Sequence, residues 1–449
     1  SQCAPPNSIM PACPSAVMVQ PTRSASGASP GLEPLRLAKP IPEFLDGSKR
    51  MFFGNKLYLL LAFVPLAFVA EHLEFSDAAI FGMACLAILP LAGLLGEATE
   101  QVALHTNETL GGLLNATFGN ATEMIVCYFA LKANLLDVVK VSLLGSILSN
   151  TLLVLGGAIL AGGIVQKTST FNQTVASCNT TLLHISILAL VVPALMKAVG
   201  QLPEGGVVDL ELSRAISLAL LVLYVLYVYF QLVTHKDGPP SAFKTPQDWQ
   251  PKSPPKPTQQ PSGLGGSVGR MLMRNKGGEP GAEEAEEEEE EEEVVLTLRG
   301  GLLWLGLATV AIAFLSELLT GSIQGAAAGL GLSQSFVGFV ILPIIGNAAE
   351  HSTAIVMAAK GKMDLAFGVA LGSSTQIALF VIPVMVLVGW AMDKGLDLFF
   401  GNFETVITFM SSLIVSHVVA DGESNWLEGV MLLFVYAIIC FAFFFYVPP

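Results

Sequence analysis

Eleven apolar stretches run through this chain, and their length limits what it can fold into. A helix needs about 20 consecutive apolar residues to cross a bilayer, and most of the stretches are that long. They cover residues 57–72, 78–98, 109–131, 136–163, 180–199, 213–233, 300–320, 334–359, 364–391, 402–420 and 426–446. The first stretch is short, but the whole pattern predicts an all-α integral membrane protein with eleven transmembrane helices.

The composition agrees with this interpretation. Hydrophobic residues make up 53% of the 449 residues, charged residues only 13%, and the mean hydropathy is +0.64. Soluble domains contain about a quarter charged residues. Ten glutamates in residues 283–293 account for most of the formal net charge of −14. Because the chain has no basic stripe, we expect no nucleic-acid partner.

Composition also divides the chain into four parts. Residues 1–50 are rich in Pro, Ser and Gly, which predicts a disordered N-terminal region. Residues 51–234 form an N-terminal transmembrane half with helices 1–6, and residues 300–449 form a C-terminal half with helices 7–11. Between them, residues 235–299 form a hydrophilic linker, whose acidic run is either a solvated spacer or a segment that attracts Ca²⁺.

The distribution of Lys and Arg predicts the orientation. These residues gather before the first helix, in the 235–299 linker, and between the eighth and ninth helices. Since positive residues accumulate on the cytosolic side, the N-terminus and the linker are predicted to be cytosolic. With eleven spans, the C-terminus then lies on the opposite side of the membrane.

An internal repeat relates the two halves. Residues 111–154 align without a gap with residues 338–381, an offset of 227 that places GNATE (119–123) over GNAAE (346–350). The two copies begin five helices apart, and an odd shift reverses direction across the membrane. The sequence therefore predicts one N-terminal helix plus two inverted five-helix repeats, an arrangement typical of transporters.

Each GNA-x-E motif places polar groups deep in an apolar segment. Glu123 lies about 21 Å along its helix, near the middle of the bilayer, and Glu350 lies at a similar depth. Each glutamate shares a helix face with the asparagine three residues before it. The preceding glycine lets the backbone loosen and free carbonyl oxygens. The predicted cation ligands are Gly119, Asn120, Glu123, Gly346, Asn347 and Glu350.

Such a set of oxygen ligands with two carboxylates suits a hard divalent cation, above all Ca²⁺. The motifs contain no thiol, and His351 adjoins Glu350 without sharing its face, so a soft metal is less favoured. When the cation leaves, two carboxylates buried close together cannot both stay ionised. We therefore expect Glu123 and Glu350 also to be the proton-coupling groups. The structural alternative is a polar packing pair between helices.

Other polar residues form two further sets. The predicted supporting residues are Ser146, Ser149, Asn150, Ser373, Gln376 and His351. The alternative for the serines is close helix packing, which also favours small residues. Glu97, Glu100 and Glu317 are candidates to line an ion path, the alternative being solvation at the membrane interface.

The chain resembles the Ca²⁺/H⁺ exchanger (cation/proton exchanger) family of the wider Ca²⁺/cation antiporter superfamily. The resemblance covers residues 50–235 and 295–446. It is carried by GLLNATFGNATE, SLLGSILSN, LPIIGNAAEH, KMDLAFGVALGSSTQIALF and DGESNWLEG. It implies eleven helices, an acidic segment between the sixth and seventh, and residence in vacuolar membranes. It also implies that Glu123 and Glu350 alternately bind Ca²⁺ and protons, with Ser and Gln on adjoining helices stabilising them.

Together these features predict a secondary active antiporter that exports cytosolic Ca²⁺ into an acidic compartment, the vacuole, in exchange for protons by alternating access. We expect a multi-pass protein of the vacuolar membrane with a cytosolic N-terminus and a lumenal C-terminus. We expect no enzyme activity and no cofactor, Ca²⁺ being the transported substrate. The alternatives are a Na⁺-coupled or Mn²⁺-transporting exchanger of the same superfamily and, from a different class, a cation channel. The sequence leaves the oligomeric state open.

Overall fold

The protein is described from a computed structural model, which describes residues 48–50, 56–201, 207–234 and 294–445. All of these residues belong to one unit, Pro42–Pro449. The predicted disordered region 1–50, apart from its last three residues, lies outside the described residues. So does most of the 235–299 linker, including its acidic run.

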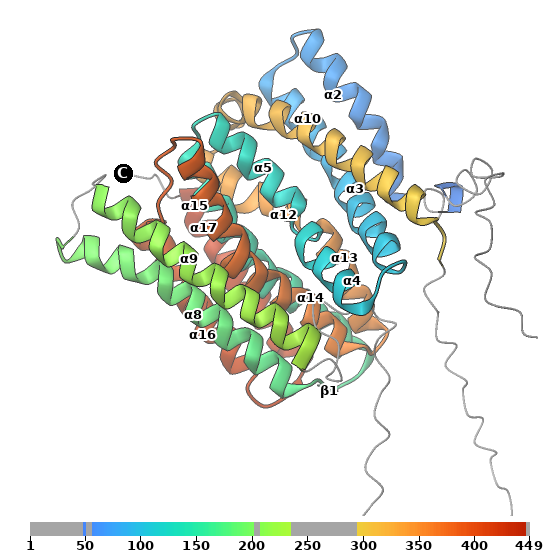
Figure 1. Cartoon of the computed structure of the whole chain (residues 1–449), viewed down its shortest axis with the longest axis vertical. Coiled ribbons are helices and arrows are strands. Elements are labelled where there is room, and N and C mark those ends of the chain that lie inside the picture. Colours follow the sequence, from blue (N-terminus) through green and yellow to red (C-terminus); the bar gives the residue numbers. More distant parts are fainter. Residues whose placement is uncertain (1–47, 51–55, 202–206, 235–293, 446–449) are drawn as a thin grey trace, which may run out of the picture. The chain divides into compact units, whose positions relative to one another are not determined.

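The N-terminal half consists of helices joined by short loops (Figure 1). Its elements are η1 (Lys56–Ala62), α2 (Phe63–His72), α3 (Asp77–Ala103), α4 (Glu108–Phe118), α5 (Ala121–Lys132), α6 (Leu136–Leu148), η2 (Ser149–Val154), α7 (Leu155–Val165), β1 (Ser169–Thr170), α8 (Gln173–Ala198), α9 (Val207–Tyr229) and η3 (Phe230–Thr234). Of the η segments, η1 is a 3₁₀-helix, and η2 and η3 are π-helical.

The C-terminal half is built in the same way. Its elements are α10 (Leu298–Leu330), α11 (Gln334–Phe336), η5 (Val337–Ile341), α12 (Leu342–Gly346), α13 (Ala348–Ala359), α14 (Met363–Gln376), η6 (Ile377–Val381), α15 (Ile382–Ala391), α16 (Asn402–Val418), β2 (Glu423–Ser424) and α17 (Trp426–Phe445). Both η5 and η6 are π-helical. Figure 1 shows α10 lying along α3, so the first long helix of this half packs against the N-terminal half.

Seven helices among the described residues are long and apolar enough to cross a membrane. The pair 334–346 and 348–359, bent by 56°, would make an eighth. Three predicted spans do not pass this test as single helices. The first is divided between η1 and α2, the third is broken between α4 and α5, and the tenth is the 17-residue α16. Eleven spans therefore remain a prediction.

Two helix breaks and two π-helical segments follow the offset of the sequence repeat. Asn120 separates α4 from α5 with φ −102° and ψ 17°, and Asn347 separates α12 from α13 with φ −91° and ψ 17°. The π-helix η2 begins at Ser149, and η6 begins directly after the aligned Gln376. Since ψ near zero does not continue an α-helix, the chain starts a new half-helix at the same point of each copy.

Polar side chains are buried within the bundle, whereas many large apolar side chains point outward. Asn150 and Asn347 are 0% exposed, while Phe434, Phe441 and Phe445 of α17 are 66, 67 and 78% exposed. This distribution is unfavourable in water, but lipid tails cover apolar side chains at no cost. The burial pattern therefore agrees with a membrane protein.

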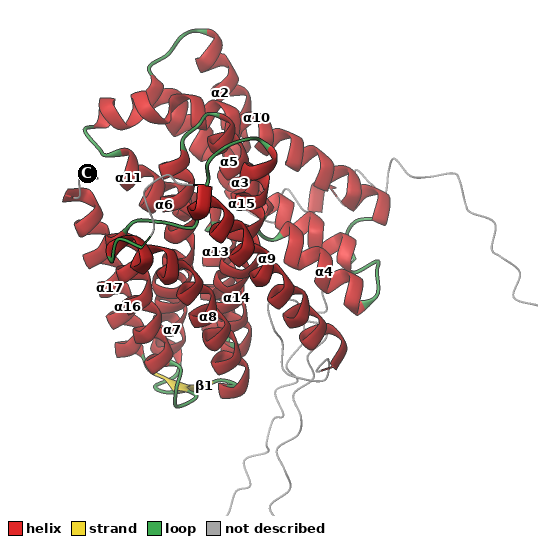
Figure 2. Ribbon diagram, turned by 60° about the vertical axis from the view of Figure 1, so that its left-hand side comes forward, coloured by secondary structure: helices red, strands yellow, loops and turns green. Residues whose placement is uncertain are grey.

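The loops gather at two ends of the helices, and α8 runs from one end to the other. At the first end, β1 pairs antiparallel with β2 (Figure 2), and the Asn172 backbone N–H donates to Asp364 Oδ1 at the start of α14 (2.5 Å). At the second end, Lys197 Nζ lies 2.6 Å from Asp209 Oδ2 and 3.4 Å from Asp397 Oδ2. These contacts show which loops lie at the same end of the helices.

Two glycines allow α6 to cross η5 with close backbone contact. A Cβ atom on Gly145 would overlap the Phe339 carbonyl oxygen, and one on Gly338 would lie 2.7 Å from Val141 Cγ2. Small residues allow this approach between membrane helices. The crossing places Ser146, the residue after Gly145, beside the segment that leads into the second helix break.

Candidate ion-binding site

Both motif glutamates lie in the first turn of a half-helix. Glu123 is the third residue of α5, and Glu350 is the third residue of α13. A carboxylate in the first turn interacts favourably with the positive end of the helix dipole. The asparagine that breaks each helix, Asn120 or Asn347, directly precedes the new helix. The local structure therefore follows the GNA-x-E pattern in both copies.

The structure brings the first glutamate into contact with the second motif. A Cβ atom on Gly346 would lie 2.8 Å from Glu123 Oε1, so glycine is what allows this carboxylate to approach the α12 backbone. The Glu123 side chain is nine-tenths buried, with 7% of the residue exposed. The segments 119–123 and 346–350 thus meet, as the sequence repeat predicts.

A chain of hydrogen bonds links the first break to α14 and η2. Asn120 Nδ2 donates to Gln376 Oε1 (2.6 Å), and Ser373 Oγ donates to Asn120 Oδ1 (3.4 Å). Asn150 Nδ2 in turn donates to Ser373 Oγ (2.9 Å). All four side chains are buried. Four predicted site residues are therefore in direct contact, and they come from both copies of the repeat.

The second break has its own contacts. Asn347 Nδ2 donates to the Ser146 carbonyl oxygen (3.3 Å), and His351 Nδ1 lies 2.5 Å from the Asn347 carbonyl oxygen one turn earlier. The helix that carries Glu350, α13, packs against η2, where Ser149 is fully buried. His351 thus binds the backbone of the break.

Several buried oxygen atoms have no hydrogen-bond partner among the described residues. In and around the two motifs these include Glu123 Oε1 and Oε2, Ser149 Oγ, Asn150 Oδ1, Asn347 Oδ1 and Glu350 Oε2. A buried acceptor left without a partner costs about 1–3 kcal/mol, and more when it is charged. Oxygen atoms of this kind, gathered in and beside two contacting motifs, are ligands that a cation would satisfy, and added protons would satisfy the carboxylates among them.

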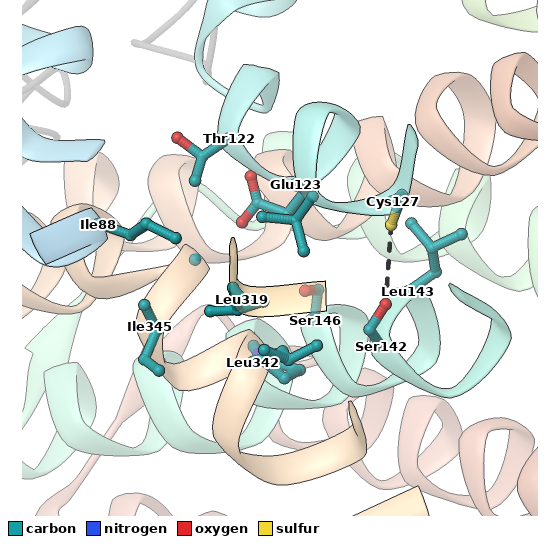
Figure 3. Close-up of a pocket in the computed structure, with 13 residues that line it drawn as sticks. Ile88, Thr122, Glu123, Cys127, Ser142, Leu143, Ser146, Leu319, Leu342 and Ile345 are labelled. Carbon is teal, nitrogen blue, oxygen red and sulfur yellow. Dashed lines mark hydrogen bonds between the residues drawn. The ribbon is translucent and has the colours of Figure 1, made fainter. Parts of the chain in front are cut away.

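A cavity borders the first motif. About 400 Å³ of space, partly open, is lined by Ile88, Thr122, Glu123, Val126, Cys127, Ser142, Leu143, Ser146, Leu319, Leu342, Pro343, Ile345 and Gly346. Figure 3 shows Glu123 in the wall of this cavity, with Ser146 across from it. Three residues of the predicted site, Glu123, Ser146 and Gly346, therefore face one space.

Three polar residues of this wall, Thr122, Cys127 and Ser142, were not among the predicted site residues. Thr122 adjoins Glu123, and Cys127 follows Glu123 by four residues, so Cys127 lies on the same face of α5. The four-residue spacing between Glu123 and Cys127 is the feature of the sequence that indicates their shared helix face. The motifs themselves contain no thiol, but the Cys127 side chain lies in the wall of the cavity beside the first motif.

The three glutamates predicted to line an ion path do not lie together. Glu97 and Glu100 follow the cavity residue Ile88 along α3, and Glu97 interacts with the Tyr58 hydroxyl. Glu317 instead forms an ion pair with Lys132 (2.8 Å), and its side chain is 55% exposed.

The packing of α3 against α10 gives the distance between Glu317 and the other two glutamates along the helix axis. These helices are antiparallel, since Gly301 lies against Val102 and Gly325 against Asp77. From this alignment Glu317 lies roughly 17 Å from the level of Glu97 at about 1.5 Å per residue. The structure therefore separates Glu317 from the other two.

Comparison with known proteins shows the family to which the chain belongs. Residues 76–233 and 300–445 match the profile of the family described as sodium/calcium exchanger protein. A Ca²⁺/H⁺ antiporter of Synechocystis sp. is 40% identical over 397 residues, which are 87% of this chain and 98% of the relative. Vacuolar cation/proton exchanger 3 of Oryza sativa subsp. japonica is 41% identical over 401 residues, 89% of this chain and 88% of the relative. The vacuolar calcium ion transporter of Schizosaccharomyces pombe is 40% identical over 402 residues, 89% and 87% of the two chains.

Solved structures show the same fold. The structure of native YfkE superposes with a TM-score of 0.67 at 32% identity and covers 87% of this chain and all of that one. The H⁺/Ca²⁺ exchanger CAX has a TM-score of 0.61 at 13% identity, covers 89% and 93% of the two chains, and so supports the fold alone. The family match, the identity to these relatives and the shared fold lead to one conclusion: the chain belongs to the sodium/calcium exchanger protein family, whose members here include Ca²⁺/H⁺ antiporters and cation/proton exchangers.

Proposed function

We propose that the chain is a secondary active antiporter that moves Ca²⁺ out of the cytosol into an acidic compartment in exchange for protons. The observation that carries this is its identity of about 40% over nearly its whole length to relatives named as Ca²⁺/H⁺ antiporter and vacuolar cation/proton exchanger. The names of the rice and fission yeast relatives support the vacuolar membrane as its location. It is a transporter and not an enzyme, and Ca²⁺ and H⁺ are its substrates.

Glu123 and Glu350 form the shared Ca²⁺/H⁺ site in this proposal. In one state the two carboxylates, with Asn120, Asn347 and backbone oxygens of the two breaks, hold Ca²⁺. In the other state the carboxylates hold about two protons. The unpaired, buried oxygens of both motifs support this, because a cation or a proton removes the cost of leaving them unsatisfied. Ser146, Ser149, Ser373 and the other supporting residues keep the asparagines in place.

The proposed topology has eleven spanning segments, with two inverted five-helix repeats after the first. The recurrence of the breaks and π-helical segments supports it. Each loop contact described above joins loops that this topology places on one side. The N-terminus and the 235–299 linker are then cytosolic and the C-terminus lumenal, with 51–234 and 300–449 as the two halves.

The exchange is energetically feasible by alternating access. Each unit of pH gradient supplies about 1.36 kcal/mol per proton. Two protons crossing about 1.5 units supply roughly 4 kcal/mol, enough for about a thousand-fold Ca²⁺ gradient without a membrane voltage. A site open to one side at a time prevents either ion from leaking down its gradient.

Uptake into proteoliposomes tests the proposal. Purified protein is reconstituted with an acidic interior, and internal Ca²⁺ is followed with a fluorescent indicator. We expect uptake that stops when an ionophore removes the pH gradient, and none when a Na⁺ gradient replaces it.

The alternatives give different results in the same vesicles. Uptake driven by Na⁺ would identify a Na⁺-coupled exchanger, and preferred uptake of Mn²⁺ would change the substrate. Ca²⁺ flux without proton counterflow would identify a channel and overturn the proposal.

A further inference from the structure

The buried face of the last helix, α17, carries a tyrosine among apolar residues. All residues of α17 are described, and the buried ones, spaced alternately by three and four along one face, are Gly429, Leu432, Tyr436, Ile439 and Phe443. Only 5% of Tyr436 is exposed. A phenylalanine would fill nearly the same space, and a buried hydroxyl costs free energy unless it finds a hydrogen-bond partner. The hydroxyl of Tyr436 therefore calls for a use.

Glycines fix the register of α17 on α7. A Cβ atom on Gly163 would lie 2.5 Å from the Trp426 backbone nitrogen, and one on Gly429 would lie 2.7 Å from the Gly156 carbonyl oxygen. Small residues allow such close approach between membrane helices. The two helices therefore run antiparallel in backbone contact (Figure 2).

This register brings Tyr436 to Ser149, the first residue of the π-helical segment η2. Tyr436 lies about two turns after Gly429, and Ser149 lies about two turns before Gly156. The Tyr436 hydroxyl is within reach of the Ser149 hydroxyl and of the Cys440 thiol. Neither hydroxyl has a well-formed hydrogen bond to a described residue, and Ser149 is fully buried. Two buried hydroxyls thus face each other beside the ion site.

The internal repeat shows what this corner of the site lacks. Its offset of 227 places Ser149 over Gln376 and the two motif asparagines over each other. Gln376 is long enough to reach its asparagine, since Asn120 Nδ2 donates to Gln376 Oε1 (2.6 Å). The shorter serine leaves Asn347 Oδ1 without a hydrogen-bond partner among the described residues. Asn347 is nevertheless near, because its Nδ2 donates to the carbonyl oxygen of Ser146, about one turn before Ser149 (3.3 Å).

We propose that Tyr436 is a positioning residue of the ion site. Its hydroxyl donates to Ser149 Oγ and turns the Ser149 hydroxyl toward Asn347 Oδ1 when Ca²⁺ is not bound there. A serine hydroxyl can accept one hydrogen bond while it donates another. This inference rests on the proposed function, in which Asn347 is a Ca²⁺ ligand. A donor that competes with Ca²⁺ for the same oxygen stabilises the Ca²⁺-free state and so favours release of the ion.

Equilibrium binding tests this role without transport. Ca²⁺ is titrated calorimetrically into the purified wild type, Tyr436→Phe, Ser149→Ala and the double variant at one fixed pH. We expect Tyr436→Phe to lower the Kd for Ca²⁺ about three- to tenfold, because one hydrogen bond of the Ca²⁺-free state is lost. Ser149→Ala should lower the Kd as well. Adding Tyr436→Phe to Ser149→Ala should change nothing further, since the tyrosine acts through the serine.

Two controls separate this role from packing. Tyr224→Phe removes an equally buried hydroxyl from α9, the helix that packs against the other π-helical segment of the site, η6. Cys440→Ala removes the other neighbour of the Tyr436 hydroxyl. We expect both variants to bind Ca²⁺ as the wild type does, and melting curves of all variants show whether they are folded.

The inference is wrong if Tyr436→Phe leaves the Kd unchanged or raises it, as a packing defect would. It is also wrong if the effects of Tyr436→Phe and Ser149→Ala add, or if the effect of Tyr436→Phe disappears in the Cys440→Ala background instead. In proteoliposomes, Tyr436→Phe should lower both the KM for Ca²⁺ and the maximal rate, because release becomes slower. If the wild type binds Ca²⁺ but shows no proton-driven uptake, the proposed function fails, and the binding measurements alone decide the role of Tyr436.

Discussion

At the scale of single residues, Glu123 is a buried carboxylate whose two oxygens have no hydrogen-bond partner among the described residues. Burying a carboxylate without a partner costs several kcal/mol, so such a group is retained only where its charge or its proton has a use. Its contact with Gly346 joins it to the second motif, which carries Glu350. These features make both glutamates the first residues to change.

Replacing either acid with its amide tests the shared site. We expect Glu123→Gln and Glu350→Gln each to reduce proton-driven Ca²⁺ uptake at least about 100-fold, which corresponds to about 2.7 kcal/mol. The reason is that an amide neither ionises nor exchanges a proton. Folding should be retained, because removing an unpaired buried charge does not destabilise a protein.

Uptake assays and melting curves on the same preparations distinguish a loss of transport from a loss of folding. Glu317→Gln is the matched control, since the Glu317 side chain is half-exposed, pairs with Lys132 and does not line the cavity. It should keep most of the wild-type uptake. Normal exchange in either of the first two variants would remove the carboxylate pair from the mechanism.

The contact between the motifs gives a second prediction. In Gly346→Ala, the new methyl group would lie 2.8 Å from Glu123 Oε1 and must displace that carboxylate. We expect Ca²⁺ uptake to fall about tenfold or more while the protein remains folded. Gly321→Ala on α10 is the control, because nothing lies within 4 Å of its added Cβ atom. If both variants transport equally well, the approach of Glu123 to α12 is unimportant for function.

At the residue scale, the sequence predicts the site residues that recur in both copies of the repeat. Glu123, Asn120 and their counterparts stand out because two identical patterns occur in apolar segments. Cys127 does not stand out, because a cysteine in an apolar helix is usually a small buried apolar residue. Its position in the cavity wall depends on how α5 meets α6, which no local pattern encodes.

At the scale of elements, the crossing of α6 and η5 depends on glycine. Gly145 allows backbone contact with Phe339, and overpacking a tight contact costs typically 1–3 kcal/mol. We expect Gly145→Ala to lower the melting temperature in detergent by several degrees. Gly306→Ala on α10, with open space around its Cβ atom, should leave it unchanged or raise it, since alanine favours helix. Equal melting temperatures would show that the two elements do not pack this closely.

Hydropathy predicts where the helices lie better than how they are interrupted. The glycines of the two motifs indicate loosened backbone, but the non-helical angles fall on the next residue, Asn120 and Asn347. The π-helical segments η2 and η6 leave no mark in hydropathy, because they change hydrogen bonding without changing polarity. They nevertheless begin at or directly after Ser149 and Gln376, two predicted supporting residues.

At the scale of the whole molecule, a buried charge network ties helices of the first half to a loop of the second. Lys140 at the start of α6 and Lys197 at the end of α8 both pair with Asp397, and Lys197 also pairs with Asp209 of α9. Apolar periodicity predicts the helices that meet here. Which charges pair was not predicted, because the partners lie up to 257 residues apart in sequence.

This network gives the last prediction. The side chains of Lys197 and Asp209 are 8% and 1% exposed, so Lys197→Met leaves the buried Asp209 carboxylate and the part-buried Asp397 carboxylate with less or no positive charge nearby. Breaking a buried pair on one side costs roughly 3–5 kcal/mol, whereas replacing both partners with apolar residues is often neutral. We expect Lys197→Met to lower the melting temperature strongly and Lys197→Met/Asp209→Leu to recover part of it. Lys132→Met, at the exposed pair with Glu317, should change it little. If Lys197→Met melts like Lys132→Met, the network contributes nothing to holding the two halves together, and their contact depends on helix packing alone.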